Sequence, residues 1–99
     1  MNEIAPSELK KMIEENANIQ IIDIRDDYVF EDFNLGGTNI PLENVINNKA
    51  KFENDKKTVF ICNSGKRSSA IVRTLTVKHQ LPNIYSLKGG IEAYVEECL

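Results

Sequence analysis

The chain has 99 residues, of which 41% are hydrophobic and 27% are charged, and its formal net charge is -3. These values predict one domain, residues 1–99, and the lack of a basic stripe argues against a nucleic-acid-binding surface. No apolar run approaches the length of a membrane span, and the first residues lack the basic start and apolar stretch of a secretory signal. We therefore expect a cytoplasmic monomer that binds neither nucleic acid nor membrane.

Two segments in the first half of the chain have clear patterns. Ser7, followed by an acidic residue and by apolar residues three and four positions apart, predicts a helix over residues 7–15. Residues 19–24 form a nearly continuous β-branched run, which is typical of a strand buried on both faces of a parallel sheet. Weaker patterns follow and predict one or two helical turns over 28–33, at most a very short strand over 38–40, a short helix over 42–46 and an exposed connection over 47–57.

The second half contains two further strand patterns, each followed by a helix. Residues 58–61 are an unbroken apolar run that ends directly on Cys62, and a helix is expected from Ser68. Residues 84–87 predict a last short strand before Gly89-Gly90 and a closing helix. Strands that alternate with helices imply right-handed βαβ connections and a mostly parallel sheet covered on both faces. Ligands of such sheets bind beyond the carboxyl ends of the strands, which is where Cys62 lies.

The segment Cys62-Asn63-Ser64-Gly65-Lys66-Arg67-Ser68 has to turn a strand into a helix over a short span. Gly65 can adopt the positive φ angle that such a turn needs, so the backbone N–H groups of the loop are expected to point inward. Inward N–H groups at the positive end of a helix form an anion-binding nest, and they also stabilise a thiolate. An isolated cysteine in this place is more often a buried structural residue. The glycine and the two cations at this spacing favour a nucleophilic Cys62 instead.

The sequence resembles the rhodanese family over nearly the whole chain, as a domain of the single-domain type. The loop of residues 62–68 is similar to the family's Cys-x-x-Gly-x-Arg-Ser, and three further motifs occur in the family's order: Ile22-Asp23-Ile24-Arg25 for Ile-Asp-Val-Arg, Asn39-Ile40-Pro41 for Asn-Ile-Pro, and residues 87–94 for Leu-x-Gly-Gly-x-x-Ala-Trp. Two features depart from the family pattern. Residues 32–37 replace its frequent Gly-His-Ile-x-Gly-Ala, and Tyr94 replaces the final Trp.

The resemblance implies a three-layer α/β domain with a mostly parallel five-stranded sheet, and a thiosulfate sulfurtransferase with ping-pong kinetics. Cys62 would carry a persulfide between a small anionic sulfur donor and an acceptor, which is cyanide, a thiol or a sulfur-carrier protein. The residues expected to bind the donor are Asn63, Ser64, Gly65, Lys66, Arg67 and Ser68. Asp23 and Arg25 are expected to support the site structurally. No cofactor is expected, and with His79 as the single histidine and no cysteine pair no metal site is expected.

Two other functions fit part of the pattern. A sulfur-delivery or regulatory binding module would keep the fold and Cys62 but turn over little thiosulfate. A cysteine phosphatase also places a thiolate in a loop that ends in Arg at a helix start, but with five residues between the two. Here Cys62 and Arg67 enclose four residues, and Ile61 stands where a phosphatase usually has His. The second cysteine, Cys98, follows two glutamates, which argues against a resolving role.

Overall fold

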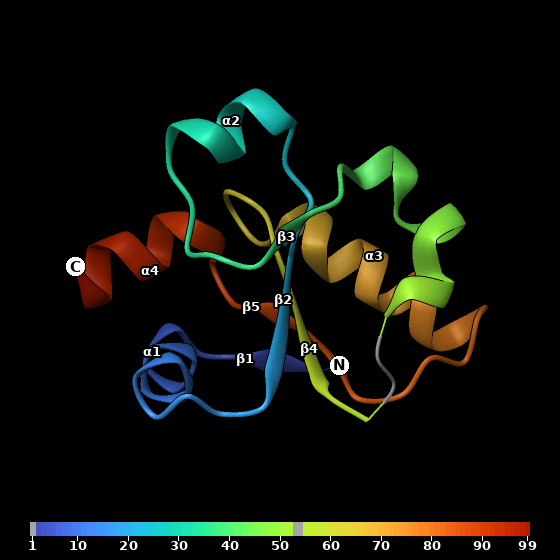
Figure 1. Ribbon diagram of the computed structural model, residues 1–99, viewed down its shortest axis with the longest axis horizontal. Coiled ribbons are helices and arrows are strands. Elements are labelled where there is room, and N and C mark those ends of the chain that lie inside the picture. The colour runs from blue at the N-terminus through green and yellow to red at the C-terminus, as the bar shows by residue number, and fades with distance from the viewer. Residues whose placement is uncertain (1, 53–54) are drawn as a thin grey trace.

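Five strands form one sheet in the computed structural model, which describes residues 2–52 and 55–99 (Figure 1). The strands are β1 (Glu3–Ile4), β2 (Ile19–Asp23), β3 (Thr38–Asn39), β4 (Lys57–Ile61) and β5 (Ile84–Leu87). Their order in the sheet is β1-β5-β4-β2-β3, and every pairing between them is parallel. The predicted α/β class with a five-stranded parallel sheet is therefore confirmed.

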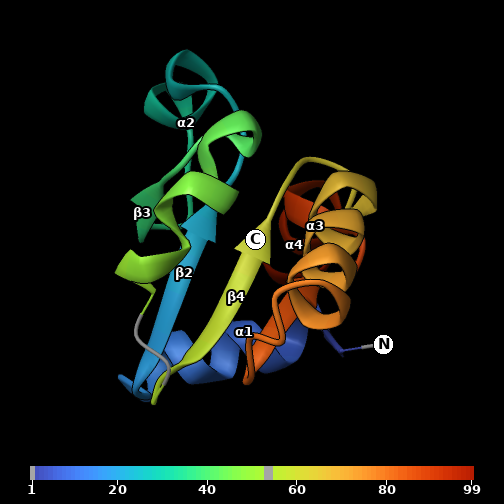
Figure 2. The same cartoon turned by 90° about the vertical axis from the view of Figure 1, so that its right-hand side faces the viewer.

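Helices cover both faces of the sheet. In Figure 1, α1 (Pro6–Glu14) and α4 (Gly90–Cys98) lie on one side of the strands, and they pack against each other. The other side carries α3 (Lys66–Val77) and two 3₁₀ helices, η1 (Leu42–Asn44) and η2 (Ile46–Lys51). Figure 2 shows α2 (Asp27–Asp32) beyond the arrowheads of β2 and β4, at the end of the sheet where the chain turns into α3.

The central strand β4 is buried on both faces, as its continuous apolar run predicts. Val59 and Ile61 belong to the cluster under α1 and α4, whereas Phe60 and Cys62 belong to the cluster under α3. These four side chains are at most 1% exposed. Because successive residues of a strand point to opposite faces, this burial fixes the register of β4 in the sheet and turns Cys62 toward α3.

The segment between η1 and β4 differs from the exposed connection that its polar residues predict. Residues 46–51 form η2, and Phe52 is buried with its ring edge-on to that of Phe60, at a centroid separation of 5.5 Å. Residues 53 and 54, which the same prediction included, lie outside the described residues. The prediction for 47–57 was therefore wrong at Phe52, because this one aromatic side chain anchors the polar segment to the core, and it missed the helical turns of η2.

One strand and one helix start also differ from the sequence patterns. The two-residue strand β1 was missed, since a pairing of Glu3 with Ser86 and of Ile4 with Leu87 is too short to leave a periodic pattern. Helix α3 begins at Lys66, two residues before the expected start at Ser68. The loop after β4 is therefore shorter than expected, and Ser68 lies within the first turn of the helix.

Candidate active site

Cys62 directly follows β4, at the carboxyl end of the sheet. Its neighbour across the sheet is the end of β2, where Asp23 pairs with Ile61, and the backbone N–H of Ile24 donates to the carbonyl oxygen of Ile61 over 2.9 Å. The parallel order of the sheet thus brings the Asp-x-Arg segment and the cysteine loop to the same edge.

Gly65 makes the tight turn from β4 into α3 possible. It caps the helix with φ of +89°, a backbone conformation that residues with a side chain rarely adopt. A Cβ atom at this position would also lie 2.9 Å from the backbone nitrogen of Gly89 and 3.2 Å from that of Gly90. Both the backbone angle and the close approach of the Gly-Gly turn therefore require glycine here.

The sulfur of Cys62 lies inside the loop and accepts hydrogen bonds from two backbone N–H groups. Gly65 N donates to Sγ over 3.1 Å and Ser68 N over 3.4 Å, and the residue is only 1% exposed. Both donors belong to the start of α3, whose N-terminal end carries the positive pole of the helix dipole. This is the inward arrangement that the sequence predicts, and it stabilises negative charge on the sulfur.

Two buried hydroxyl groups continue this hydrogen-bond network. Ser68 Oγ lies 3.5 Å from Sγ of Cys62 and 2.7 Å from Oγ of Ser86, which projects from β5. Neither serine has any exposed surface. Sequence reasoning missed Ser86, although a serine within the apolar run of residues 84–87 was a signal that its hydroxyl needs a buried partner.

Asp23 and Arg25 form a buried ion pair, 1% and 4% exposed, beside the loop. Arg25 Nε donates to Asp23 Oδ1 over 3.0 Å and Nη2 to Oδ2 over 2.9 Å. The same guanidinium donates to the carbonyl oxygen of Phe33 over 2.6 Å and reaches Asn63 Oδ1 at 3.5 Å. The pair therefore joins three segments: the end of β2, the chain after α2 and the cysteine loop.

The Gly-Gly segment holds the loop through backbone groups alone. Ile91 N donates to the carbonyl oxygen of Cys62 over 2.9 Å, and Glu92 N donates to that of Asn63 over 3.0 Å. The first turn of α4 therefore supplies donors to the loop, which explains why the Leu-x-Gly-Gly motif accompanies the cysteine motif in this chain.

The remaining loop residues are on the surface. Asn63 and Ser64 are exposed, and the Lys66 and Arg67 side chains are exposed in the first turn of α3. Ser64 Oγ accepts from the backbone N–H of Lys66 over 3.4 Å. The structure thus brings Gly65 and Ser68 onto the sulfur, whereas the two cations are exposed in the turn that carries these donors.

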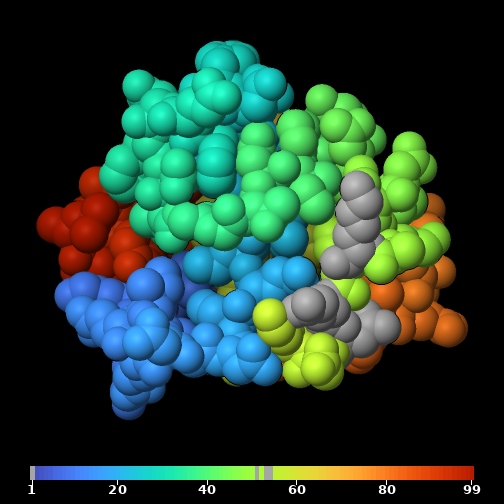
Figure 3. Space-filling model, viewed as in Figure 1, coloured from blue at the N-terminus to red at the C-terminus, as the bar shows by residue number. Residues whose placement is uncertain are grey.

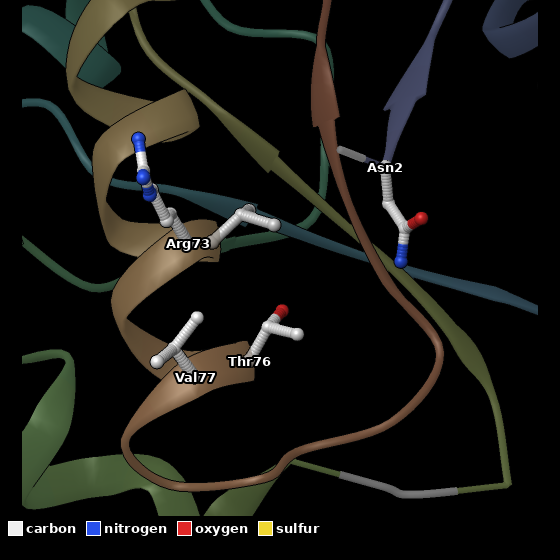
Figure 4. A pocket seen from close by; sticks show the side chains of 5 residues that line it. Asn2, Arg73, Thr76 and Val77 are labelled. Carbon is white, nitrogen blue, oxygen red and sulfur yellow. The ribbon is translucent and has the colours of Figure 1, made fainter.

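Two hollows open on the surface, and one of them borders the cysteine loop. One, of about 410 Å³, borders the loop and is lined by Glu3, Ser64, Gly65, Lys66, Ser69 and Gly89. The other, of about 430 Å³, lies between Asn2 and the side chains of Val72, Arg73, Thr76 and Val77 on α3 (Figure 4). Among the described residues no three His, Cys, Asp or Glu side chains gather closely enough to hold a metal ion. Nor does that part of the chain contain a helix long and apolar enough to cross a membrane.

Fold and site together define an α/β domain in which a parallel strand delivers a cysteine into a nest of backbone amides. The family model of the rhodanese-like domain matches residues 5–97. The chain therefore belongs to the rhodanese-like domain family, which comprises sulfurtransferases and related proteins. No curated protein matches the sequence.

Solved structures agree with this assignment. A rhodanese-related protein from Thermoplasma volcanium is 27% identical, with a TM-score of 0.84 over 99% of this chain and 94% of that one. A rhodanese-like domain protein from Staphylococcus aureus is 26% identical, with a TM-score of 0.84 over 100% of this chain and 96% of that one. A protein from Rhodopseudomonas palustris described as a possible tyrosine phosphatase is 19% identical, with a TM-score of 0.83 over 97% of this chain and 80% of that one. At 19% identity, this last similarity shows a shared fold and no shared activity.

Proposed function

We propose that this protein is a sulfurtransferase in which Cys62 carries sulfane sulfur as a persulfide. The observation that carries the proposal is the pair of N–H groups, from Gly65 and Ser68, that donate to Sγ. Donors in this position stabilise the thiolate needed for attack. Charge-assisted hydrogen bonds from the same groups also stabilise the sulfur anion that a persulfide carries.

In the first half-reaction the Cys62 thiolate attacks the outer sulfur of thiosulfate or a similar anionic donor. The new S–S bond forms as the bond between the two donor sulfur atoms breaks, and its electron pair leaves with sulfite. In the second half-reaction cyanide or a thiolate attacks the outer sulfur of the persulfide, and the electron pair returns to Cys62. Charge and electrons balance in each half, so the cycle needs no oxidant, reductant or cofactor.

The other loop residues act on the donor and on the loop itself. Gly65 and Ser68 present their N–H groups to the sulfur, and the exposed cations Lys66 and Arg67 draw an anionic donor toward the loop. Asn63 and Ser64 form the exposed crest that the donor meets first. Asp23 and Arg25 hold the loop in place through Asn63. Because Cys62 is nearly buried, a suitable donor presents a single terminal sulfur atom, as thiosulfate does.

Intact-mass spectrometry after incubation with thiosulfate tests the proposal. Wild type and Cys98→Ser are expected to gain the mass of one sulfur atom, which cyanide then removes as thiocyanate. Cys62→Ser, which keeps Cys98, is expected to gain nothing while its circular dichroism stays unchanged. Sulfur gain in Cys62→Ser, or none in a folded wild type, contradicts the proposal. Hydrolysis of an aryl phosphate without sulfur loading would instead support the phosphatase alternative.

A second candidate, delivery of sulfur to or from a protein, is favoured by the surface of residues 26–33. Tyr28 and Phe33 are 70% and 41% exposed there, and the segment also carries four exposed acidic side chains: Asp26, Asp27, Glu31 and Asp32. Figure 3 shows the α2 segment covering the upper part of one face of the molecule. Exposed aromatic rings favour a protein contact, whereas the carboxylates repel a small dianion.

The two candidates are distinguished by their preferred donor. Delivery predicts slow turnover of thiosulfate and faster sulfur loading from the persulfide of a basic cysteine peptide than from that of an acidic peptide of equal length. Tyr28→Ser is expected to slow loading from the basic peptide and to leave loading from thiosulfate unchanged. Equal rates with both peptides, together with rapid thiosulfate turnover, favour the small-molecule function.

A further inference from the structure

Ser68 and Ser86 form a hydroxyl pair next to the sulfur of Cys62. The proposed sulfur-transfer cycle uses neither hydroxyl group. The two Oγ atoms are 2.7 Å apart, and both residues are fully buried. Ser68 comes from the first turn of α3 and Ser86 from β5, so the pair joins the helix that caps the sulfur to the strand next to β4. A hydrogen bond this short between buried groups holds both side chains in one orientation.

The direction of this hydrogen bond follows from the acceptors within reach. Within the described part of the chain, Ser68 Oγ is the one hydrogen-bond partner that the structure gives Ser86 Oγ. If Ser68 donated to Ser86, the proton of Ser86 would have no acceptor in a site without water contact, which is costly. Ser86 therefore donates and Ser68 accepts.

Ser68 then keeps its own proton for one of two other acceptors. The first is the carbonyl oxygen of Gly65, to which Ser68 Oγ donates over 3.3 Å. The second is Sγ of Cys62, at 3.5 Å, which donates to Ser68 Oγ as a thiol and can only accept as a thiolate. When Cys62 is a thiolate the charged sulfur is the stronger acceptor, because hydrogen bonds to ionised groups are about twice as strong as those between neutral groups. We infer that Ser86 is a positioning residue that orients the Ser68 hydroxyl as a third donor to the Cys62 thiolate.

This inference rests on the proposed function in one respect, namely that Cys62 works as a thiolate. Several charged side chains lie around the loop: Asp23 and Arg25 next to Asn63, and Lys66 and Arg67 on α3. Strand β1 adds Glu3, which lines the hollow that borders the loop. Helix α4 adds Glu92, which is exposed and contacts the loop through its backbone N–H. A substitution at position 86 alters none of these charged groups. A change in the thiolate equilibrium of Cys62 in such a variant therefore reports on the hydroxyl pair.

The thiolate absorbance of Cys62, measured against pH, tests the inference. Each variant is made with Cys98→Ser, and the spectrum of the Cys62→Ser/Cys98→Ser protein is subtracted to remove tyrosine ionisation. Ser86→Ala is expected to lower the equilibrium constant for thiolate formation about three- to tenfold, since it weakens one hydrogen bond to a charged group. The matched control is Thr58→Val, which removes a buried hydroxyl that donates to Gln20 on the neighbouring strand. It is expected to leave the pH profile unchanged.

A double-mutant cycle separates positioning from a general loss of packing. Ser68→Ala is expected to shift the profile at least as far as Ser86→Ala, and the double variant no further than Ser68→Ala. An additional shift in the double variant, or a Ser86→Ala profile identical to that of Thr58→Val, overturns the inference. An unchanged profile in Ser68→Ala overturns it as well, even if Ser86→Ala proves unstable.

The measurement involves no sulfur donor, so it is independent of the proposed activity. A shifted profile in a protein that accepts no sulfur from thiosulfate contradicts the proposed function alone. Sulfur loading with an unshifted Ser86→Ala profile contradicts this inference alone. If the proposed function and this inference are both correct, Ser86→Ala slows sulfur loading near neutral pH, and the loading rate recovers as the pH is raised. A distorted site would not show this recovery.

Discussion

Position 90 has no room for a side chain against the carbonyl oxygen of Cys62. Gly90 begins α4 with φ of +66°, and a Cβ atom on it would overlap the carbonyl groups of Cys62 and Asn63. Those two carbonyl oxygens accept the N–H groups of Ile91 and Glu92. The closing helix can therefore hold the cysteine loop only if its first residue is glycine.

Gly90→Ala is accordingly expected to lower the free energy of unfolding by about 3 kcal/mol, through the left-handed backbone angle and the overlap with the loop. Gly36→Ala is the matched control, because Gly36 has φ of +93° but nothing within 4 Å of an added Cβ. Its expected cost is about 1 kcal/mol, from the backbone angle alone. Urea denaturation measures both. Equal losses in the two variants would show that the overlap with the loop carries no energy.

Arg25→Met is expected to lower the free energy of unfolding by about 3–5 kcal/mol, because it leaves the buried Asp23 carboxylate without its cation. It also removes the contacts with Phe33 and Asn63, so sulfur loading is expected to slow. Lys10→Met serves as the control, since its pair with Glu14 is exposed and spans 3.6 Å. Its expected cost is below about 1 kcal/mol. Stability of Arg25→Met within the range of Lys10→Met would contradict a structural role for the buried pair.

Removing both exposed cations of the loop, with Lys66→Ala/Arg67→Ala, is expected to lower kcat/KM for thiosulfate about tenfold at low ionic strength. The effect arises from long-range attraction of a dianion, so it should shrink as added salt screens the charges. Arg73→Ala/Lys78→Ala removes the same amount of charge from two exposed positions, one further along α3 and one directly after its end. This control is expected to keep most of the activity. A loss that persists at high salt would assign Lys66 or Arg67 a direct contact instead.

The alkaline limit of stability is expected to depend on Tyr94. Burial raises the pKa of the Tyr94 hydroxyl above its ordinary value of 10.0, and the nearby Cys98 and Glu14 raise it further. Because the folded state favours the neutral phenol, the stability linked to this group is fully present below pH 10 and is lost as the pH rises through the folded value. Urea denaturation across this range should show a steeper decline for wild type than for Tyr94→Phe. Tyr28→Phe, at a 70% exposed position, should follow wild type.

Local patterns in the sequence predict much of this molecule. The apolar runs before Asp23 and Cys62 predict two strands of a parallel sheet, and Gly65 predicts the turn that aims backbone N–H groups at the sulfur. These features are predictable because each depends on residues within a few positions of one another. Phe52 and β1 are different, since one buried ring in a polar segment and a two-residue strand leave no periodic pattern.

The sequence by itself determined the fold class and the place of Cys62 at the end of a strand, because burial on both faces and the conformational freedom of glycine are recorded locally. Only the tertiary structure decided which distant groups meet that sulfur. The order β1-β5-β4-β2-β3 sets β5 beside β4 and so brings the Ser86 hydroxyl to Ser68, 18 residues away along the chain. The same packing sets Gly90 against the Cys62 carbonyl. Contacts of this kind depend on how strands are ordered in space, which no spacing along the chain encodes.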